Sequence, residues 1–297
     1  MNMTLGSLIL RGRRKFGDGL TVFFYRDIVR PKILNTPPVI GLHESEAEIH
    51  VLTSATDWMN LVWTLKSFYA VSPRRFLLSI HGDSTLSCDA VQDLQYIFPD
   101  ARIITAVEAD DAVLPTLREH PKCYTFRSRN TLARKIFDFR HFLRGQRIAL
   151  FDSDLLFFDP PTAWIAHIES GDDERNVFNE DVGTAYAVPL REIQEHCGEV
   201  ITNLNSGFGV VYPDSLRLDW LEEFLSIPGM LDGHFWRIEQ TLFALCSTRF
   251  GVELLPDDYR VYLEPGLAGR PFRHYVGAVR HLMYSEGMRA LVPRLLK

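Results

Sequence analysis

The 297-residue sequence lacks the long apolar runs and the leader pattern that mark several classes of protein. No segment approaches the roughly 18 to 20 consecutive apolar residues that a membrane-spanning helix needs. Residues 1–10 have no basic lead and a very short apolar run, and the basic cluster at residues 11–15 follows this run. That order is the reverse of a secretory signal. We therefore expect neither a spanning helix nor a secretory leader.

Cysteine is scarce, and two glycine motifs that hold phosphates are missing. The four cysteines lie far apart, without a Cys-x-x-Cys pair or zinc-like spacing. This argues against a disulfide framework or structural zinc and predicts reduced thiols in the cytoplasm. Neither Gly-x-Gly-x-x-Gly nor Gly-x-x-x-x-Gly-Lys occurs, so we expect no dinucleotide fingerprint and no P-loop. The net charge of −6 gives no indication of a nucleic-acid partner.

The middle of the chain alternates between two kinds of hydrophobic pattern. Short apolar runs predict strands at 49–53, 76–80 and 102–107, and helical spacing predicts helices at 58–69, 87–98, 110–120 and 130–143. This alternation is typical of βαβ units in an α/β domain with a mostly parallel sheet. We expect residues 1–45 to form an N-terminal extension, 46–280 the main domain and 281–297 a C-terminal tail.

The tail is basic and amphipathic. From residue 270 onward, six arginine or lysine residues stand against the single acid Glu286, among several leucine, methionine and valine residues. Such an arm fits an anionic ligand or an anionic membrane surface. The alternative is a terminal helix that packs on the domain and leaves its arginines in water.

Two apolar runs, 148–151 and 155–158, flank the triplet Asp152-Ser153-Asp154. The first run predicts a strand buried on both faces. In an extended chain residues two apart point the same way, so Asp152 and Asp154 would present paired oxygen ligands to Mg²⁺ or Mn²⁺. Ligands of open α/β sheets bind at the carboxyl ends of strands, where the loop 53–57 also lies. Alternatively, the two acids cap the next turn or helix, as we expect of Asp159 before Pro160.

Several short motifs occur in a recognisable order between residues 49 and 280. They are the strand and loop 51–57, Leu132-Ala133-Arg134-Lys135, Asp152-Ser153-Asp154, Asn205-Ser206-Gly207, Ile238-Glu239-Gln240 and His274-Tyr275-Val276-Gly277-Ala278-Val279-Arg280. This order resembles the GT-A nucleotide-sugar glycosyltransferases, most closely the glycosyltransferase family 8 type that includes glycogenin and bacterial galactosyltransferases. The resemblance implies a Rossmann-like, mostly parallel sheet flanked by helices. It also implies a hexosyltransferase that uses a nucleotide-diphosphate sugar, with UDP as the expected nucleotide.

The resemblance further implies a set of ligand contacts. Asp152, Asp154 and His274 would hold Mn²⁺ (or Mg²⁺), which bridges both phosphates of the leaving group and neutralises their charge. The donor contacts it implies are Thr53, Ser54, Asp57, Arg134, Lys135, Asp152, Ser153, Asn205, Ser206, Gly207, Gly277 and Arg280. The family usually has Lys at the position of Arg280, and its Pro-Trp is replaced here by His281-Leu282. Arg134 and Lys135 could equally belong to a solvated helix face.

The catalytic residues implied by the resemblance are Gln240 and Glu239. Retaining members place the glutamine beneath the anomeric carbon, whereas an inverting enzyme would need a carboxylate base, for which Glu239 could serve. The family commonly has Asp-Gln-Asp, and this chain has Glu-Gln-Thr. We expect a retaining enzyme acting on a glycan, a lipid-linked glycan or another hydroxyl acceptor. The alternatives are a catalytically inactive nucleotide-sugar-binding scaffold and a nucleotidyltransferase that makes sugar nucleotides, although the glycine-rich loop of the latter is absent.

Overall fold

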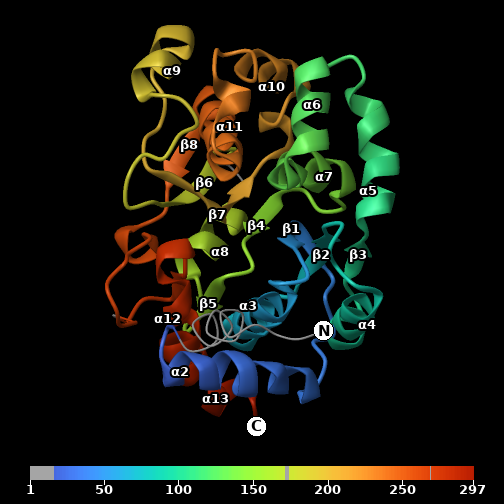
Figure 1. Ribbon diagram of the computed structural model, residues 1–297, viewed down its shortest axis with the longest axis vertical. Helices are drawn as coiled ribbons and strands as arrows, with labels where there is room; N and C mark the ends of the chain where they lie inside the picture. Colours follow the sequence, from blue (N-terminus) through green and yellow to red (C-terminus); the bar gives the residue numbers. More distant parts are fainter. Residues whose placement is uncertain (1–16, 171–173, 268) are drawn as a thin grey trace, which may run out of the picture.

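The computed structural model describes residues 17–170, 174–267 and 269–297 (Figure 1). Within these residues seven strands form one sheet in the order β3-β2-β1-β4-β7-β6-β8. Their bounds are β1 Glu44–Thr53, β2 Phe76–Gly82, β3 Arg102–Ile104, β4 Ile148–Phe151, β6 Asn176–Glu180, β7 Leu204–Val211 and β8 Val252–Leu254. The helices beside it include α3 Trp58–Val71, α4 Cys88–Ile97, α7 Arg134–Phe142, α8 Thr162–Glu169 and α11 Phe235–Phe250.

The sheet is parallel on one side and mixed on the other. β1 pairs in parallel with β2 and β4, and β2 pairs in parallel with β3. β7 runs antiparallel to both β4 and β6, and β8 is parallel to β6. The predicted α/β architecture with a mostly parallel central sheet is confirmed.

Strand β4 lies in the middle of the sheet, and both of its faces are buried. Ala149 and Phe151 belong to the core on the side of α3 and α8, whereas Ile148 and Leu150 belong to the core on the side of α7 and α11. This alternation follows from the two-residue period of a strand. A strand that buries both faces has to be apolar throughout, which explains the uninterrupted run that precedes Asp152.

Two predicted boundaries near β3 were wrong. The strand predicted at 102–107 ends at Ile104, and α5 (Ala106–Val113) begins before the predicted helix at 110–120. The side chain of Thr105 accepts a hydrogen bond from the N–H of Glu108 and thereby caps the helix. The remaining helices are α6 Pro121–Arg129, α9 Leu190–Cys197 and α10 Leu218–Phe224.

A small second sheet begins where the chain leaves β4. β5 (Leu155–Phe157) pairs antiparallel with β9 (Phe272–His274), and Leu155 lies opposite His274. The N–H of Tyr275 donates to the carbonyl of Asp154 at 2.9 Å. This pairing brings a histidine from the end of the chain beside the Asp-Ser-Asp turn.

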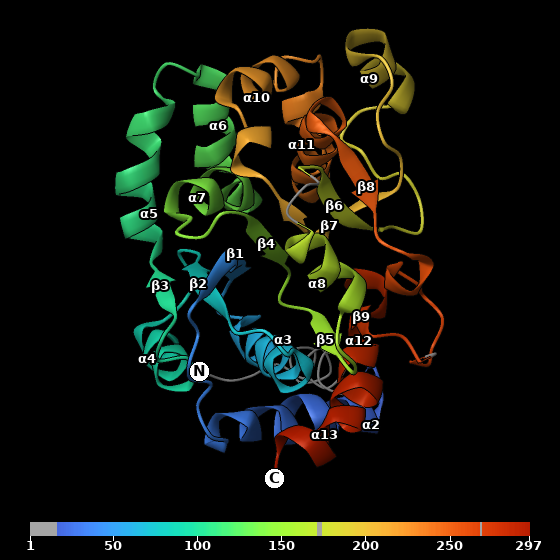
Figure 2. The same cartoon turned by 180° about the vertical axis from the view of Figure 1, so that it is seen from behind.

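The two terminal segments lie side by side at one end of the molecule (Figures 1 and 2). Helix α2 (Leu20–Phe23) continues as irregular helix to residue 35, and α12 (Arg280–Leu282) continues through residues 283–288 into α13 (Arg289–Leu295). Val22, Ile33 and Leu291 join the apolar core that includes α3. The domain boundaries at residues 45 and 280 stay predictions. No helix in the described part of the chain is long and apolar enough to cross a bilayer.

Candidate metal centre and adjoining cleft

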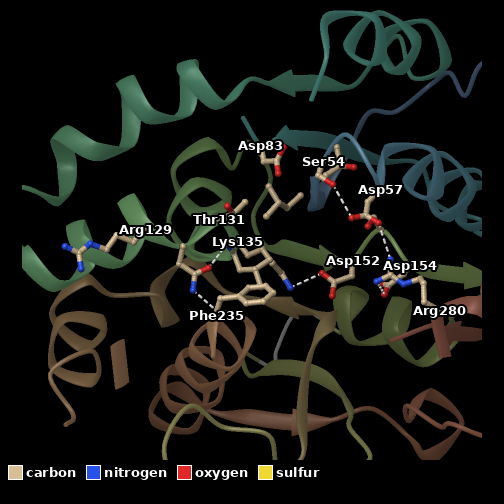
Figure 3. A pocket seen from close by; sticks show the side chains of 15 residues that line it. Ser54, Asp57, Asp83, Arg129, Thr131, Lys135, Asp152, Asp154, Phe235 and Arg280 are labelled. Carbon is tan, nitrogen blue, oxygen red and sulfur yellow. Dashed lines mark hydrogen bonds and ion pairs between the residues drawn. The ribbon is translucent and has the colours of Figure 1, made fainter. Parts of the chain in front are cut away.

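A cavity of about 530 Å³ lies at the carboxyl ends of β1, β2 and β4 (Figure 3). Its walls come from the loop after β1, the residue after β2, the junction of α6 and α7, the Asp-Ser-Asp turn, the start of α11 and Arg280. The parallel half of the sheet thus gathers polar loop residues at one rim, as it does in other open α/β sheets.

Asp152 and Asp154 line this cavity, and His274 lies against both carboxylates. One ligand atom from each lies within 4.8 Å of the others. Among the described residues, this is the group of side chains that could hold a metal ion. The Nε2 atom of His274 is 3.1 Å from Oδ1 of Asp154 and 3.8 Å from Oδ2 of Asp152. Two carboxylates and an imidazole form a donor set that suits Mn²⁺ or a similar divalent ion.

The residues behind His274 fix its ring in the orientation that a ligand needs. Its Nδ1 atom is 3.0 Å from Oδ1 of Asn205, and the amide of Asn205 in turn donates to Asp181 at 2.9 Å. With its N–H directed at Asn205, Nδ1 leaves the lone pair of Nε2 facing the two carboxylates. Metal-bound histidines are usually held by such a partner, so the arrangement fits a divalent cation.

Charge around Asp154 keeps it ionised. Burial by itself would raise the pKa of Asp154, but His274 and Arg280 lower it to about 2. The guanidinium of Arg280 is 2.5 Å from Asp154 and 3.2 Å from Asp57. Burial would lower the pKa of His274, but Asp154 and Asp152 raise it above its ordinary value. A bound cation would replace the histidine proton, because both stabilise the same pair of carboxylates.

Lys135 organises the other side of Asp152. This buried ammonium group lies 2.9 Å from Oδ1 of Asp152, 2.9 Å from Glu239 and 2.8 Å from the carbonyl of Ser206. Burial would lower the pKa of Lys135, but the two carboxylates raise it. Asp152 therefore divides its oxygens between Lys135 and the side that faces His274.

Replacing Lys135 should destabilise the fold strongly. In Lys135→Met the buried carboxylate of Glu239 and the half-buried carboxylate of Asp152 lose their shared cation, so we expect the free energy of unfolding to fall by about 3 to 5 kcal/mol. The double variant Lys135→Met/Glu239→Gln should recover part of this loss, because one of the stranded charges is removed. Urea unfolding measures both values. A single variant as stable as the wild type would contradict the assigned role of Lys135.

Glu239 should make stability depend on pH. Burial and the nearby Asp152 carboxylate raise its pKa to about 7 from 4.5, against the opposing effect of Lys135. Its contribution to stability is therefore complete below pH 4.5 and lost as the pH rises to about 7. Relative to Glu239→Gln, measured by urea unfolding in EDTA, the wild type should lose about 3 kcal/mol over this range. If the difference in stability between the wild type and Glu239→Gln does not depend on pH, the pKa of Glu239 is not raised.

The structure brings half of the sixteen predicted site residues to the cavity. Its walls include the predicted residues Thr53, Ser54, Asp57, Lys135, Asp152, Ser153, Asp154 and Arg280. Arg134 instead pairs with Asp110 at 2.7 Å and Asp138 at 3.2 Å, so it does not line the cavity. Asn205, Ser206 and Gly207 lie on β7 behind the metal-binding group. Gly277 begins the turn that leads to Arg280.

The two predicted catalytic residues lie on α11 and are buried. Glu239 is held by Lys135 and by the hydroxyl of Ser206, which donates to it at 2.8 Å. Gln240 is 3% exposed, and within the described residues its side-chain nitrogen has no hydrogen-bond partner. Neither residue lines the cavity in this structure.

Seven residues of the cavity wall were not among the predicted site residues: Leu52, Asp83, Arg129, Asn130, Thr131, Leu132 and Phe235. Asp83 follows β2 directly. It could have been predicted from the sequence, because an acidic residue at the carboxyl end of a strand is a candidate ligand-binding residue. Asn130 and Phe235 are 105 residues apart, and the amide of Asn130 donates to the carbonyl of Phe235 at 2.8 Å. No local pattern reveals a contact of that kind.

Comparison with known proteins gives a fold assignment. No protein-family model matches this chain, and no curated protein does either. Among solved structures, mouse xyloside xylosyltransferase 1 superposes over 78% of this chain and 98% of its own, with a TM-score of 0.53 and 11% identity. The chain has the GT-A fold.

A second solved structure agrees with this assignment. The bifunctional glycosyltransferase WbbM matches over 81% of this chain and 47% of its own, with a TM-score of 0.52 and 12% identity. Identities this low establish the shared GT-A fold alone. Membership of glycosyltransferase family 8 stays a prediction.

Proposed function

We propose that this protein is a metal-dependent glycosyltransferase that moves a hexose from a nucleotide-diphosphate sugar, of the UDP type, to a hydroxyl acceptor. The observation that carries the proposal is the convergence of Asp152, Asp154 and His274 within 4.8 Å, with the two aspartates lining a cavity in a GT-A fold. Those residues would hold Mn²⁺ or Mg²⁺. When bound, the ion acts as a Lewis acid on the diphosphate of the donor.

The order of residues along the cavity suggests how the donor lies. Figure 3 shows Asp83, Ser54 and Asp57 along the upper edge of the cavity, a position suited to the nucleoside. Asp152, Asp154 and Arg280 follow, where the diphosphate would be held. The guanidinium of Arg280 offers a fork of donors to phosphate oxygens and balances charge that develops on the leaving group. The hexose then falls between Lys135 and Phe235.

The surroundings of Glu239 and Gln240 favour a reaction that retains the configuration of the sugar. An inverting transferase needs a carboxylate that can take the acceptor proton. Glu239 is already held by Lys135 and Ser206, and it does not line the cavity. Gln240 keeps a side-chain nitrogen without a partner within the described structure, and this group would give a hydrogen bond to the donor sugar. We therefore assign it the role beneath the anomeric carbon.

A panel of UDP-sugars tests the proposal. Hydrolysis should require Mn²⁺ or Mg²⁺, and nuclear magnetic resonance of the first product should show the anomeric configuration of the donor. Calorimetry with UDP should show binding that depends on Mn²⁺. Binding without any turnover would favour the inactive scaffold, and pyrophosphate release from UTP with a sugar 1-phosphate would favour a nucleotidyltransferase.

We also propose that the protein works in the cytoplasm with peripheral contact to a membrane. Arg289, Arg294 and Lys297 are exposed on the C-terminal arm. Beside that arm, Leu20, Phe24 and Ile28 are exposed at four-residue spacing along α2 and the irregular helix that continues it. A basic surface with an apolar stripe suits anionic lipid.

Vesicle sedimentation tests the membrane contact. The protein should pellet with vesicles that contain phosphatidylglycerol and stay in solution with pure phosphatidylcholine. Raising the salt concentration should weaken the binding, because screening acts on exposed charges. Arg289→Glu/Arg294→Glu should release the protein, and Arg191→Glu on the distant α9 should not. Equal sedimentation with both kinds of vesicle would contradict a charge-dependent contact.

A further inference from the structure

A second cavity, of about 480 Å³, adjoins the first. It lies between α6 and the segment 225–233 that precedes α11. The two cavities share three wall residues, Arg129, Asn130 and Phe235. Phe235, with Arg129 and Asn130, therefore forms the boundary between the two cavities.

The boundary is held in place by Asn130. The amide of Asn130 donates to the carbonyl of Phe235, and its oxygen accepts a hydrogen bond from the N–H of Leu132 at 3.0 Å. The residue that ends α6 is thus tied both to the start of α11 and to the turn that leads into α7. Phe235 is 57% exposed at this position. An exposed aromatic ring in a cavity wall can pack against the apolar face of a ligand ring.

The position of Arg129 shows which part of a substrate passes this boundary. In Figure 3 Arg129 lies at the end of the first cavity away from Asp154 and Arg280, with Lys135 and Phe235 in between. It is therefore remote from the place of the diphosphate. Arg129 is exposed and makes no hydrogen bond or ion pair within the part of the chain that the structure describes.

The charge of the second cavity is mainly positive. Lys122 and Arg129 line it, and Asp232 is the one carboxylate among its described wall residues. The backbone N–H groups at the start of α6 are already capped by Glu222, at 2.9 to 3.1 Å. The two side-chain cations are therefore the groups available to an anion there.

We propose that the second cavity is the acceptor subsite and that it takes a saccharide bearing a carboxylate or a phosphate. The inference rests on the proposed glycosyl transfer. An acceptor hydroxyl beside Phe235 would form its bond to the anomeric carbon while the bond from that carbon to the phosphate oxygen breaks. The electron pair leaves with the nucleoside diphosphate, and the hydroxyl proton passes to the released phosphate. Phe235 packs against the acceptor ring, and Arg129 with Lys122 holds its anionic group.

Matched acceptors test the charge preference. With a donor that the enzyme hydrolyses, we would compare methyl β-glucoside, methyl β-glucuronide and glucose 6-phosphate by mass spectrometry of the products. At least one of the acidic acceptors should exceed the neutral one by about tenfold in transfer relative to hydrolysis, as expected for a charge-assisted contact of about 1.4 kcal/mol. The two acidic compounds distinguish a carboxylate site from a phosphate site.

Variants locate the subsite. Arg129→Ala and Lys122→Ala should lower the ratio of transfer to hydrolysis for the acidic acceptor, and Phe235→Ala should lower it for every acceptor. Arg191→Ala, an exposed arginine on α9, serves as the matched control and should change nothing. Equal use of neutral and acidic acceptors, or unaltered ratios in all three variants, would overturn the proposal.

A direct binding measurement separates this inference from the proposed activity. If no donor is hydrolysed, the glycosyltransferase proposal fails. Binding of the protein to a glycan array then tests the second cavity alone. Retention of acidic glycans that Arg129→Ala abolishes would support an anionic saccharide site. Retention that this variant does not change, or no retention of acidic glycans, would refute it.

Discussion

Replacing Asp154 by Ala should abolish Mn²⁺-dependent binding of UDP and lower donor hydrolysis by at least about a thousandfold, because a metal contributes several kcal/mol to this chemistry. Asp154 contributes the Oδ1 atom that lies 3.1 Å from Nε2 of His274, and its low pKa keeps it charged at every physiological pH. Calorimetry with UDP, with and without Mn²⁺, measures binding, and release of UDP measures hydrolysis.

The control for Asp154 lies five residues further along the chain. Asp159 is an exposed carboxylate in the turn before Pro160, and Asp159→Ala should change the rate by less than about twofold, as for most surface substitutions. Asp154→Asn preserves the volume of the side chain and separates loss of the metal ligand from loss of folding, which circular dichroism checks. Metal-independent binding of UDP, or unaffected binding in the Ala variant, would contradict the metal centre.

Replacing Gly207 by Ala should damage the same centre through packing alone. A Cβ atom at this position would overlap the ring of His274 and lie 2.9 Å from Oδ2 of Asp152. Two of the three predicted ligands would have to move, so we expect Mn²⁺ affinity to fall by about a hundredfold. Overpacking on the buried β7 should also cost about 1 to 3 kcal/mol of stability. Calorimetry with Mn²⁺ and urea unfolding measure the two effects.

Gly183 provides the matched control. A Cβ atom there would meet no neighbour within 4 Å, and its backbone does not have a positive φ. Gly183→Ala should therefore leave both the metal affinity and the stability unchanged. If Gly207→Ala binds Mn²⁺ as tightly as the wild type does, Mn²⁺ binding does not depend on the close contact between His274 and Gly207.

The parallel half of the sheet and the metal-binding pair could be predicted from sequence for local reasons. The buried strand β4 needs an uninterrupted apolar run, and the polar residues that follow it stand out at the strand's end. The same reasoning failed at Thr105, where a single side-chain cap ended β3 early and started α5. The hydrophobic pattern of residues 102–107 allows either a longer strand or an earlier helix, and the hydrogen bond made by Thr105 favours the earlier helix.

The role of Lys135 and of its neighbour Arg134 shows a different limit. Both residues lie at the start of α7, and the sequence treats them alike. In the fold, Arg134 pairs with Asp110 and Asp138, while Lys135 bridges Asp152 and Glu239. Successive residues of a helix point about 100° apart, so only the packing of α7 on the sheet decides which cation reaches the cavity.

The sequence by itself determined the α/β class, the turn that carries Asp152 and Asp154, and the absence of a P-loop. Each depends on residues that are close in the chain. The order of motifs also indicated His274, but only the tertiary structure placed it, because the pairing of β5 with β9 joins residues more than a hundred positions apart. The tertiary structure alone brought Asn205 behind His274, placed Gly207 beneath its ring, and made Phe235 a wall residue of both cavities. These contacts arise from packing between distant segments, which no local pattern encodes.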